Sequence, residues 1–199
     1  MGLDGLTVVV NPANNFAQCL TVEQLKTIWD AGSAVKSWNQ VDPSFPDQPL
    51  TLYGPGTDSG TFDFFTEVVN GKARQSRSDY TASEDDNVLV QGVSGDVNAL
   101  GYFGLAYYIE NQDKLKSVAI DGGKGCVEPS FETVNKGEYA PLSRPLYIYA
   151  KKAALERPEV LEFVKFYLTN AETLVSEVGY VAVPQNVYDA GLGLLAAYE

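Results

Sequence analysis

The stretch Tyr53–Phe65, which reads YGPGTDSGTFDFF, constrains the fold of this chain more than any other part of its sequence. A short apolar run, Leu50–Tyr53, leads into it, and apolar residues at helical spacing follow from Phe62 onward. The stretch therefore predicts a strand, a glycine-rich turn and then a helix that begins near Ser59. Units of this kind are typical of α/β folds.

The same turn has the chemistry of an anion site. It places Ser59, Gly60 and Thr61 at the start of the helix, where free backbone N–H groups, two hydroxyls and the positive end of the helix dipole converge. The glycines Gly54 and Gly56 allow the backbone to approach a ligand closely. Ser59 is also a good N-cap, and an N-cap serine needs no ligand, so the local chemistry leaves both interpretations open.

Strands alternate with helices along the rest of the chain, which predicts an α/β fold. The β-branched run Leu6–Val10 is typical of a buried strand, and the capping box Thr21–Gln24 opens a helix with an apolar face. Periodicity predicts further helices over 85–100, 160–168, 174–178 and 186–199, and further strands over 101–108, 115–120 and 146–150.

Several segments follow the order of one known family. Besides the turn, the sequence resembles phosphate-binding proteins that serve Pst-type ABC transporters in the segments Ser76–Val93, Leu6–Pro12, Leu20–Trp29, Gly101–Gly104 and Gly125–Val127. The resemblance covers nearly the whole chain in colinear order. It implies a periplasmic-binding-protein-like α/β lobe with a mixed central sheet, together with a C-terminal remnant of the other lobe.

The resemblance also implies a division into domains. Residues 8–146 would form the second lobe, and residues 1–7 and 147–199 would form part of the first lobe, with hinge strands near 6–11 and 146–150. Family members usually carry most of the first lobe ahead of this point, including another phosphate loop. The chain therefore resembles a family member that is truncated at its N-terminus, whether by nature or by engineering.

The function that the resemblance implies is binding without catalysis. The parent protein would bind inorganic phosphate and deliver it to an ABC permease, in the periplasm or another extracytoplasmic space, and the site in this chain would be incomplete. A signal sequence is absent from the chain. Two alternatives remain, namely binding of another tetrahedral oxyanion such as sulfate, and a folding or assembly module with no ligand function.

The expected phosphate-binding residues are Ser59, Gly60, Thr61 and Arg77. Many family members carry an arginine just before the Ser-Gly-Thr turn, but no arginine stands there in this sequence. We therefore expect the positive charge to come from Arg77, because a guanidinium matches phosphate oxygens in a bidentate fork. The alternative is that Arg77 is a surface arginine paired with Asp79.

Composition excludes several other classes of function. The chain has 14 Lys and Arg against 26 Asp and Glu, a net charge of −12, which argues against broad binding to nucleic acids or anionic membranes. It has no histidine, which removes a Ser-His-Asp triad and any His-ligated metal site. The acidic cluster Glu84–Asp86 fits a helix start better than a calcium site, because the EF-hand spacing is absent. We expect neither a cofactor nor a metal.

Cys19 and Cys126 are the two cysteines of the chain. The residues alone are equally consistent with two buried free thiols. The extracytoplasmic setting that the resemblance implies favours a disulfide between them.

The C-terminal segment carries apolar helix faces near Val160–Leu168 and Leu174–Val178. In the resembled fold a first-lobe sheet covers such faces, and an uncovered apolar patch of that size is rare on soluble monomers. The segment can fold back on its own lobe, stay disordered or exchange with a second copy. We expect a homodimer through the C-terminal tail.

Overall fold

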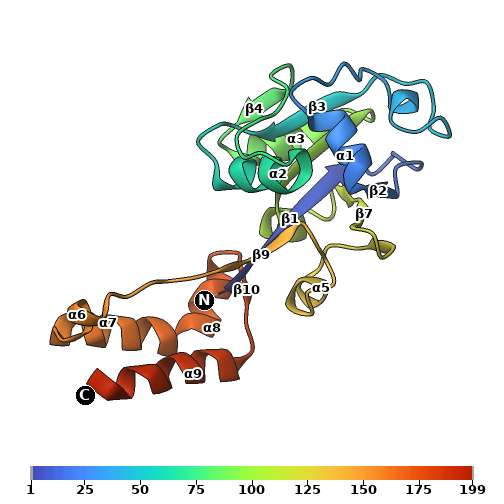
Figure 1. Cartoon of the computed structure of the whole chain (residues 1–199). Helices are drawn as coiled ribbons and strands as arrows, with labels where there is room; N and C mark the ends of the chain where they lie inside the picture. Colours follow the sequence, from blue (N-terminus) through green and yellow to red (C-terminus); the bar gives the residue numbers. More distant parts are fainter. Residues whose placement is uncertain (1, 199) are drawn as a thin grey trace.

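Strand β1 (Gly2–Val10) runs through the whole molecule in the computed structural model, which describes residues 2–198. The C-terminal half of β1 pairs antiparallel with β5 (Ala99–Gly104) and β6 (Lys116–Ser117). Its N-terminal half pairs antiparallel with β9 (Ser143–Leu146) and β10 (Val181–Ala182). By these pairings β1 joins a large α/β lobe to a smaller body of C-terminal helices (Figure 1).

The sheet of the large lobe is mixed. β3 (Thr51–Pro55) pairs parallel with β5 on one side and with β4 (Thr81–Ser83) on the other, whereas β1 and β5 are antiparallel. A second, three-stranded sheet consists of β2 (Cys19–Thr21), β7 (Ala119–Asp121) and β8 (Cys126–Val127). The predicted α/β class with a mixed central sheet is confirmed.

Helices cover both faces of the main sheet. Neighbouring residues of a strand point to opposite faces, so β1 contributes side chains to two cores. Val8 and Val10 share one core with α1 (Val22–Trp29) and α2 (Gly60–Asn70). Val9 lies in the other core, which it shares with α3 (Asp86–Gly95). The first core also contains aromatic contacts, in which the Phe65 ring stacks on Tyr102 and Trp29 makes a T-shaped contact with Tyr102. A 3₁₀ turn, η1 (Trp38–Gln40), lies in the loop before β3.

Several predicted boundaries were wrong by a few residues. The helix expected over 85–100 ends at Gly95, and β5 takes residues 99–104, since pairing with β1 and β3 outweighs the helical pattern of its apolar residues. The strand expected over 101–108 likewise ends at Gly104, where α4 (Leu105–Glu110) begins. The returning strand is Ser143–Leu146 rather than 146–150, and α5 (Phe131–Asn135) lies before it.

The C-terminal segment forms a body of its own around the N-terminal half of β1. It comprises α6 (Lys152–Leu155), α7 (Pro158–Thr169), α8 (Ala171–Glu177), α9 (Gln185–Leu195) and a 3₁₀ turn η2 (Ala196–Tyr198). Buried side chains from these helices make a separate small core, and α8 packs on β10. The tail therefore folds on its own chain. Among residues 2–198 no helix combines the length and the apolar character needed to cross a membrane.

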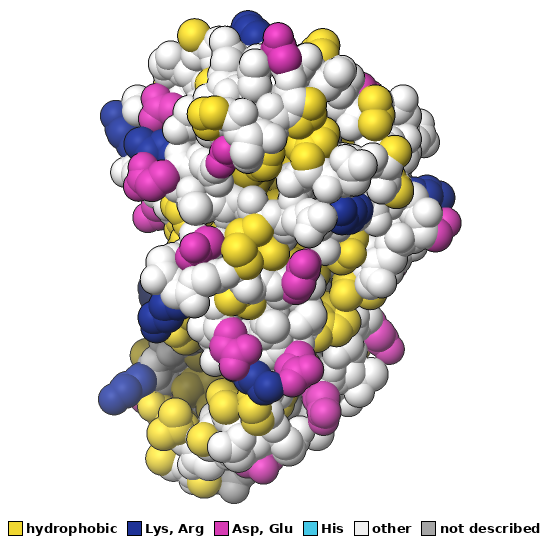
Figure 2. Space-filling view, turned by 90° about the vertical axis from the view of Figure 1, so that its right-hand side faces the viewer, with side chains coloured by type: hydrophobic (Ala, Val, Ile, Leu, Met, Phe, Trp, Pro, Cys, Tyr) yellow, Lys and Arg dark blue, Asp and Glu magenta, His cyan; other side chains and the backbone are white. Residues whose placement is uncertain are grey.

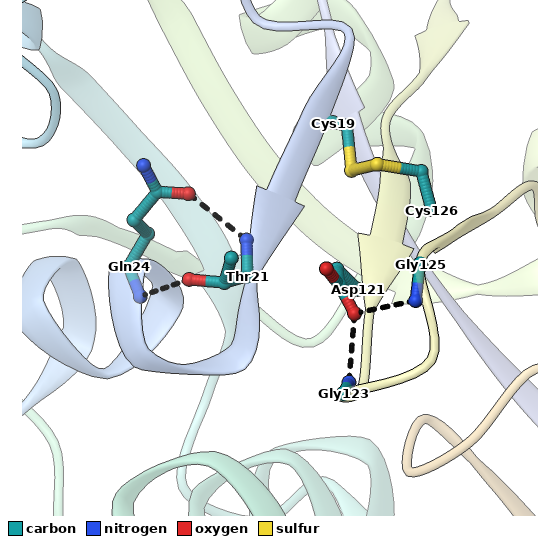
Figure 3. Close-up of a disulfide and its surroundings, with 7 residues drawn as sticks. All are labelled: Cys19, Thr21, Gln24, Asp121, Gly123, Gly125 and Cys126. Atoms are coloured by element: carbon teal, nitrogen blue, oxygen red, sulfur yellow. Dashed lines mark hydrogen bonds between the residues drawn. A yellow bond between two sulfur atoms is a disulfide. The ribbon is translucent and has the colours of Figure 1, made fainter.

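The predicted disulfide between Cys19 and Cys126 is confirmed (Figure 3). The bond joins β2 to β8 on either side of β7, with a Cα–Cα distance of 6.0 Å. Next to it, Asp121 Oδ1 accepts hydrogen bonds from the amides of Gly123 and Gly125, which fixes the turn between β7 and β8. The predicted capping box follows β2, where Thr21 caps α1.

Removing the disulfide should destabilise the lobe strongly. The two cysteines are 107 residues apart in sequence, and closing a loop of that size in the unfolded chain corresponds to roughly 3–5 kcal/mol. We expect the double variant Cys19→Ser, Cys126→Ser to lose about that much unfolding free energy in urea titrations. Wild-type protein kept in a reducing agent is the matched control and should unfold like the variant. Two titratable thiols in denatured, unreduced wild type would contradict the account.

Candidate functional site

The turn after β3 starts helix α2 as the sequence predicts. Ser59 is the N-cap, with extended backbone angles, and its Oγ accepts hydrogen bonds from the amides of Thr61 at 3.1 Å and Phe62 at 3.5 Å. The helix is held in place by its apolar face, with Phe62 and Phe65 buried. It ends at Asn70, and the C-cap residue Gly71 has a positive φ of 82°, which suits glycine. The start of α2 is thus capped by Ser59 and packed on the core of the lobe.

Three donor groups at this helix start are left for a ligand. Ser59 Oγ is an acceptor inside the cap, so its own hydroxyl proton points elsewhere. Within residues 2–198 neither the Gly60 amide nor the Thr61 hydroxyl has a hydrogen-bond partner, and Gly60 is exposed. The Thr61 amide, in contrast, is used by the cap. The arrangement suits an acceptor with several oxygens, such as an oxyanion.

A carboxylate lies on one side of the turn. Glu84 Oε1 accepts a hydrogen bond from the Asp58 amide at 3.2 Å, and a β-carbon at position 56 would lie only 2.0 Å from the same oxygen. A side chain at position 56 would therefore displace the Glu84 carboxylate from the turn. Burial raises the pKa of Asp86 to about 6, and the neighbouring charges of Asp85 and Glu84 add to the effect. This side of the turn is negatively charged and offers an anion no attraction.

Arg77 lies away from these groups in a structural role. Its side chain is only 3% exposed, and Nη1 donates to the carbonyls of Ile28 at 3.0 Å and Val35 at 2.9 Å. Nε and Nη2 donate to the carboxylate of Asp79. These hydrogen bonds from Arg77, together with one from Lys36, hold the pKa of Asp79 well below its usual range. The described contacts of Arg77 therefore fix the loop after α1, and none of them reaches the turn.

Two other arginines contact the turn and its helix. Arg74 Nη2 donates to the Thr57 carbonyl at 2.8 Å. Arg144, from β9, donates through Nη2 to the Gly60 carbonyl at 3.3 Å and through Nε to Asp4 Oδ2 at 3.1 Å. Burial raises the pKa of Asp4, and the charge of Arg144 opposes this rise. Neither arginine was predicted as a site residue. Arg74 was expected to be solvated, and Arg144 is 84 residues from Gly60 in the sequence.

In the part of the chain that the structure describes, residues 2–198, no group of three or more His, Cys, Asp or Glu side chains is arranged to hold a metal ion. The cluster Glu84–Asp86 contributes a helix cap instead, since Asp85 Oδ1 accepts from the Asn87 amide. The geometry at the start of α2 therefore offers hydrogen-bond donors to a ligand.

A family model described as a PBP superfamily domain matches residues 1–171. The chain belongs to the PBP superfamily. Within it, the chain is 52% identical over 194 residues to Protein SphX of Synechocystis sp., covering 96% of this chain and 58% of that protein. It is 40% identical over 200 residues to the phosphate-binding protein PstS of Staphylococcus haemolyticus, covering 98% of this chain and 61% of that protein. The chain thus spans less than two thirds of the length of these curated relatives.

Solved structures of the PBP superfamily agree with this assignment. A crystal structure described as a possible phosphate binding protein from Planctomyces limnophilus superimposes with a TM-score of 0.92 at 56% identity. The match covers 99% of this chain and 70% of that one. The predicted resemblance to phosphate-binding proteins, and with it the predicted fold class, is confirmed.

The raised pKa of Asp86 makes a pH dependence of stability testable. Because its folded pKa of about 6 lies above the ordinary 3.8, the folded state binds this proton more tightly than the unfolded state does. The contribution of Asp86 to the unfolding free energy should therefore increase as the pH falls from neutrality towards 3.8, and decrease as the pH rises through about 6. Urea titrations of wild type and Asp86→Asn across this range should diverge at neutral pH, with the variant the more stable.

The exposed carboxylate Glu110 provides the control, since it lies on α4 away from the turn. Glu110→Gln should follow the wild-type pH profile. Parallel profiles for wild type and Asp86→Asn would show that burial of this carboxylate does not affect stability.

Proposed function

We propose that the chain is the ligand-contacting part of a phosphate-binding protein of an ABC transporter, and that it holds inorganic phosphate at the start of α2. One observation carries the proposal. In a chain 40% identical to a phosphate-binding protein PstS, the Gly60 amide and the Thr61 hydroxyl stand without a partner among residues 2–198, beside the Ser59 cap. Helix N-termini with such donors suit phosphate.

The proposed role is binding without catalysis. Chemistry on phosphate would need a positioned base, nucleophile or metal. The carboxylate that contacts this turn, Glu84, accepts a hydrogen bond from the Asp58 amide, and Asp86 lies in the first turn of α3. Delivery to a membrane permease in an extracytoplasmic space accords with the Cys19–Cys126 disulfide, because such bonds persist in oxidising compartments. Binding of another tetrahedral oxyanion, such as sulfate, is the second candidate.

In this proposal each of two lobes supplies part of the phosphate site. Residues 8–146 would form one complete lobe with its half of the site, and residues 1–7 and 147–199 would form part of the other lobe. β1 and β9 are the two strands that run between them (Figure 1). The curated relatives are longer than this chain, and in this proposal the groups that complete the phosphate site belong to the part of those relatives that the chain does not match. The chain alone should therefore bind phosphate more weakly than a complete two-lobed protein.

Thr61→Ala should weaken phosphate binding without affecting stability. The Thr61 hydroxyl has no partner in the described protein, so its loss should leave the unfolding free energy unchanged and cost about 1 kcal/mol of binding, roughly a fivefold rise in Kd. Ser59→Ala is the matched comparison, because it removes the N-cap and should also cost about 1 kcal/mol of unfolding free energy. Calorimetric titration with phosphate, and separately with sulfate, measures the affinities.

Three outcomes of that titration separate the candidates. Phosphate binding that exceeds sulfate binding and weakens in Thr61→Ala supports the proposal. Equal affinity for both anions favours a general oxyanion site. No heat at millimolar phosphate would leave a folding or assembly module, and submicromolar binding by a verified monomer would contradict the half-site argument.

We also propose that a second copy of the chain covers the exposed face of the tail. Phe163, Phe166 and Leu194 are 64%, 59% and 76% exposed, and hydrophobic side chains surround a hollow in the lower part of the molecule, where the tail helices lie (Figure 2). Among residues 2–198 the segment Tyr147–Ala150, which follows β9, pairs with no strand, although its residues favour β structure. Exposed apolar faces favour self-association, and an unpaired segment with high β propensity adds to the tendency.

Sedimentation equilibrium over a wide concentration range tests this association. We expect a reversible monomer–dimer equilibrium, and Leu194→Glu should shift it towards monomer by placing a charge in the contact. Val97→Glu is the matched control, since Val97 is 48% exposed but lies on the large lobe. A compact monomer at every concentration would exclude the homodimer.

A further inference from the structure

We propose that Arg144 supplies the positive charge of the oxyanion site at α2, and that Asp4 positions its guanidinium there. The inference rests on the proposed function of this helix start. A doubly charged phosphate meets a chain with a net charge of −12 and a carboxylate, Glu84, hydrogen-bonded to the turn. No arginine stands in the turn itself, and Arg77 is occupied elsewhere. A cation from another element is therefore required.

The β1–β9 ladder places Arg144 beside Asp4. The two residues are direct partners in the antiparallel register of these strands. Nε and Nη2 of Arg144 each lie 3.1 Å from Asp4 Oδ2, and the Asp4 side chain is only 9% exposed. A buried carboxylate on a central strand has little freedom, so it holds the guanidinium in one orientation.

Helix α2 holds the other side of the same guanidinium. Its central carbon lies 4.4 Å from the centre of the Phe64 ring, a cation–π contact, and Nη2 donates to the Gly60 carbonyl at 3.3 Å. Phe64 is four residues after Gly60, so both contacts lie on one face of α2, at its first turn. Arg144 is thus fixed before any ligand arrives, which lowers the entropy cost of binding.

Donors of Arg144 remain for an anion. Nη1 has no partner among residues 2–198, and about a third of the side chain, 34%, is exposed. Gly60 connects the two halves of the proposed site, because its carbonyl accepts from Arg144 while its amide has no partner. A β-carbon at position 60 would lie 3.7 Å from Nη2, so the absent side chain leaves the surface between amide and guanidinium open. One tetrahedral anion has enough oxygens to accept from both.

Arg74 is the competing candidate. It contacts the turn through the Thr57 carbonyl, and its Nε lies 3.5 Å from Asp63 Oδ1. Its side chain is 59% exposed, and it has neither a buried carboxylate nor an aromatic ring to hold it. An exposed pair of this kind contributes little to a fixed site. Arg74 therefore makes a matched control, since Arg74→Gln and Arg144→Gln change the charge of the chain equally.

The experiment is a titration of ¹⁵N-labelled protein with inorganic phosphate, at constant ionic strength and in a buffer free of other oxyanions. The amide signals of Gly60 and Thr61 report binding at the helix start. We expect Arg144→Gln to raise the Kd by at least tenfold, Arg144→Lys to raise it by less, and Arg74→Gln to change it by less than threefold. In wild type, the Nε–H signal of Arg144 should shift with the same Kd as the Gly60 amide.

The outcomes separate this inference from the proposed function. If the Gly60 and Thr61 signals do not respond to phosphate in wild type, both the proposed function and the role of Arg144 fail. If they respond and Arg144→Gln binds as wild type does, only the role of Arg144 fails. If Arg144→Gln does not fold, the Nε–H signal of Arg144 in wild type provides the test. If this signal does not shift while phosphate saturates the Gly60 amide signal, the role of Arg144 is overturned.

Discussion

The antiparallel pairing along β1 is the interaction on which the rest of the molecule depends. One half of the strand pairs with β5, which carries β3 and the turn of α2 at its other edge, and the other half pairs with β9 and β10. The register of these ladders sets where distant parts of the chain meet. It brings Asp4, Gly60 and Arg144 into contact, and it seats the C-terminal helices on the same strand.

Because the chain carries a net negative charge, phosphate binding requires local groups whose attraction exceeds the electrostatic repulsion from the rest of the chain. The N-terminus of α2 contributes oriented N–H dipoles that attract an anion, but the negative charge of Glu84 on one side of the turn opposes this attraction. A guanidinium fixed on the other side balances that carboxylate and adds charge where an anion would lie. The proposed site is therefore an arrangement of three elements, of which the recognisable turn is only one.

Local patterns in the sequence predicted local structure well and distant contacts poorly. The Ser59 cap, the Thr21 capping box and the tail helices depend on neighbouring residues, and all three form as expected. The Cys19–Cys126 bond was predicted from the family context. Arg77 was predicted because a guanidinium matches phosphate oxygens, whereas its side chain pairs with Asp79 and the register of β9 on β1 brings Arg144 to α2. Residues 99–104 were assigned partly to a helix because tertiary pairing, not periodicity, makes them a strand.

Anomalous diffraction from a crystal soaked in arsenate tests the central claim most directly, because arsenate has the shape and charge of phosphate and a heavier central atom. The account predicts a peak at the start of α2, with the anion within hydrogen-bonding distance of the Gly60 amide and Arg144 Nη1. A peak only elsewhere, such as beside Lys124 and Lys136 at the cavity between the β7–β8 turn and the end of α5, would contradict it.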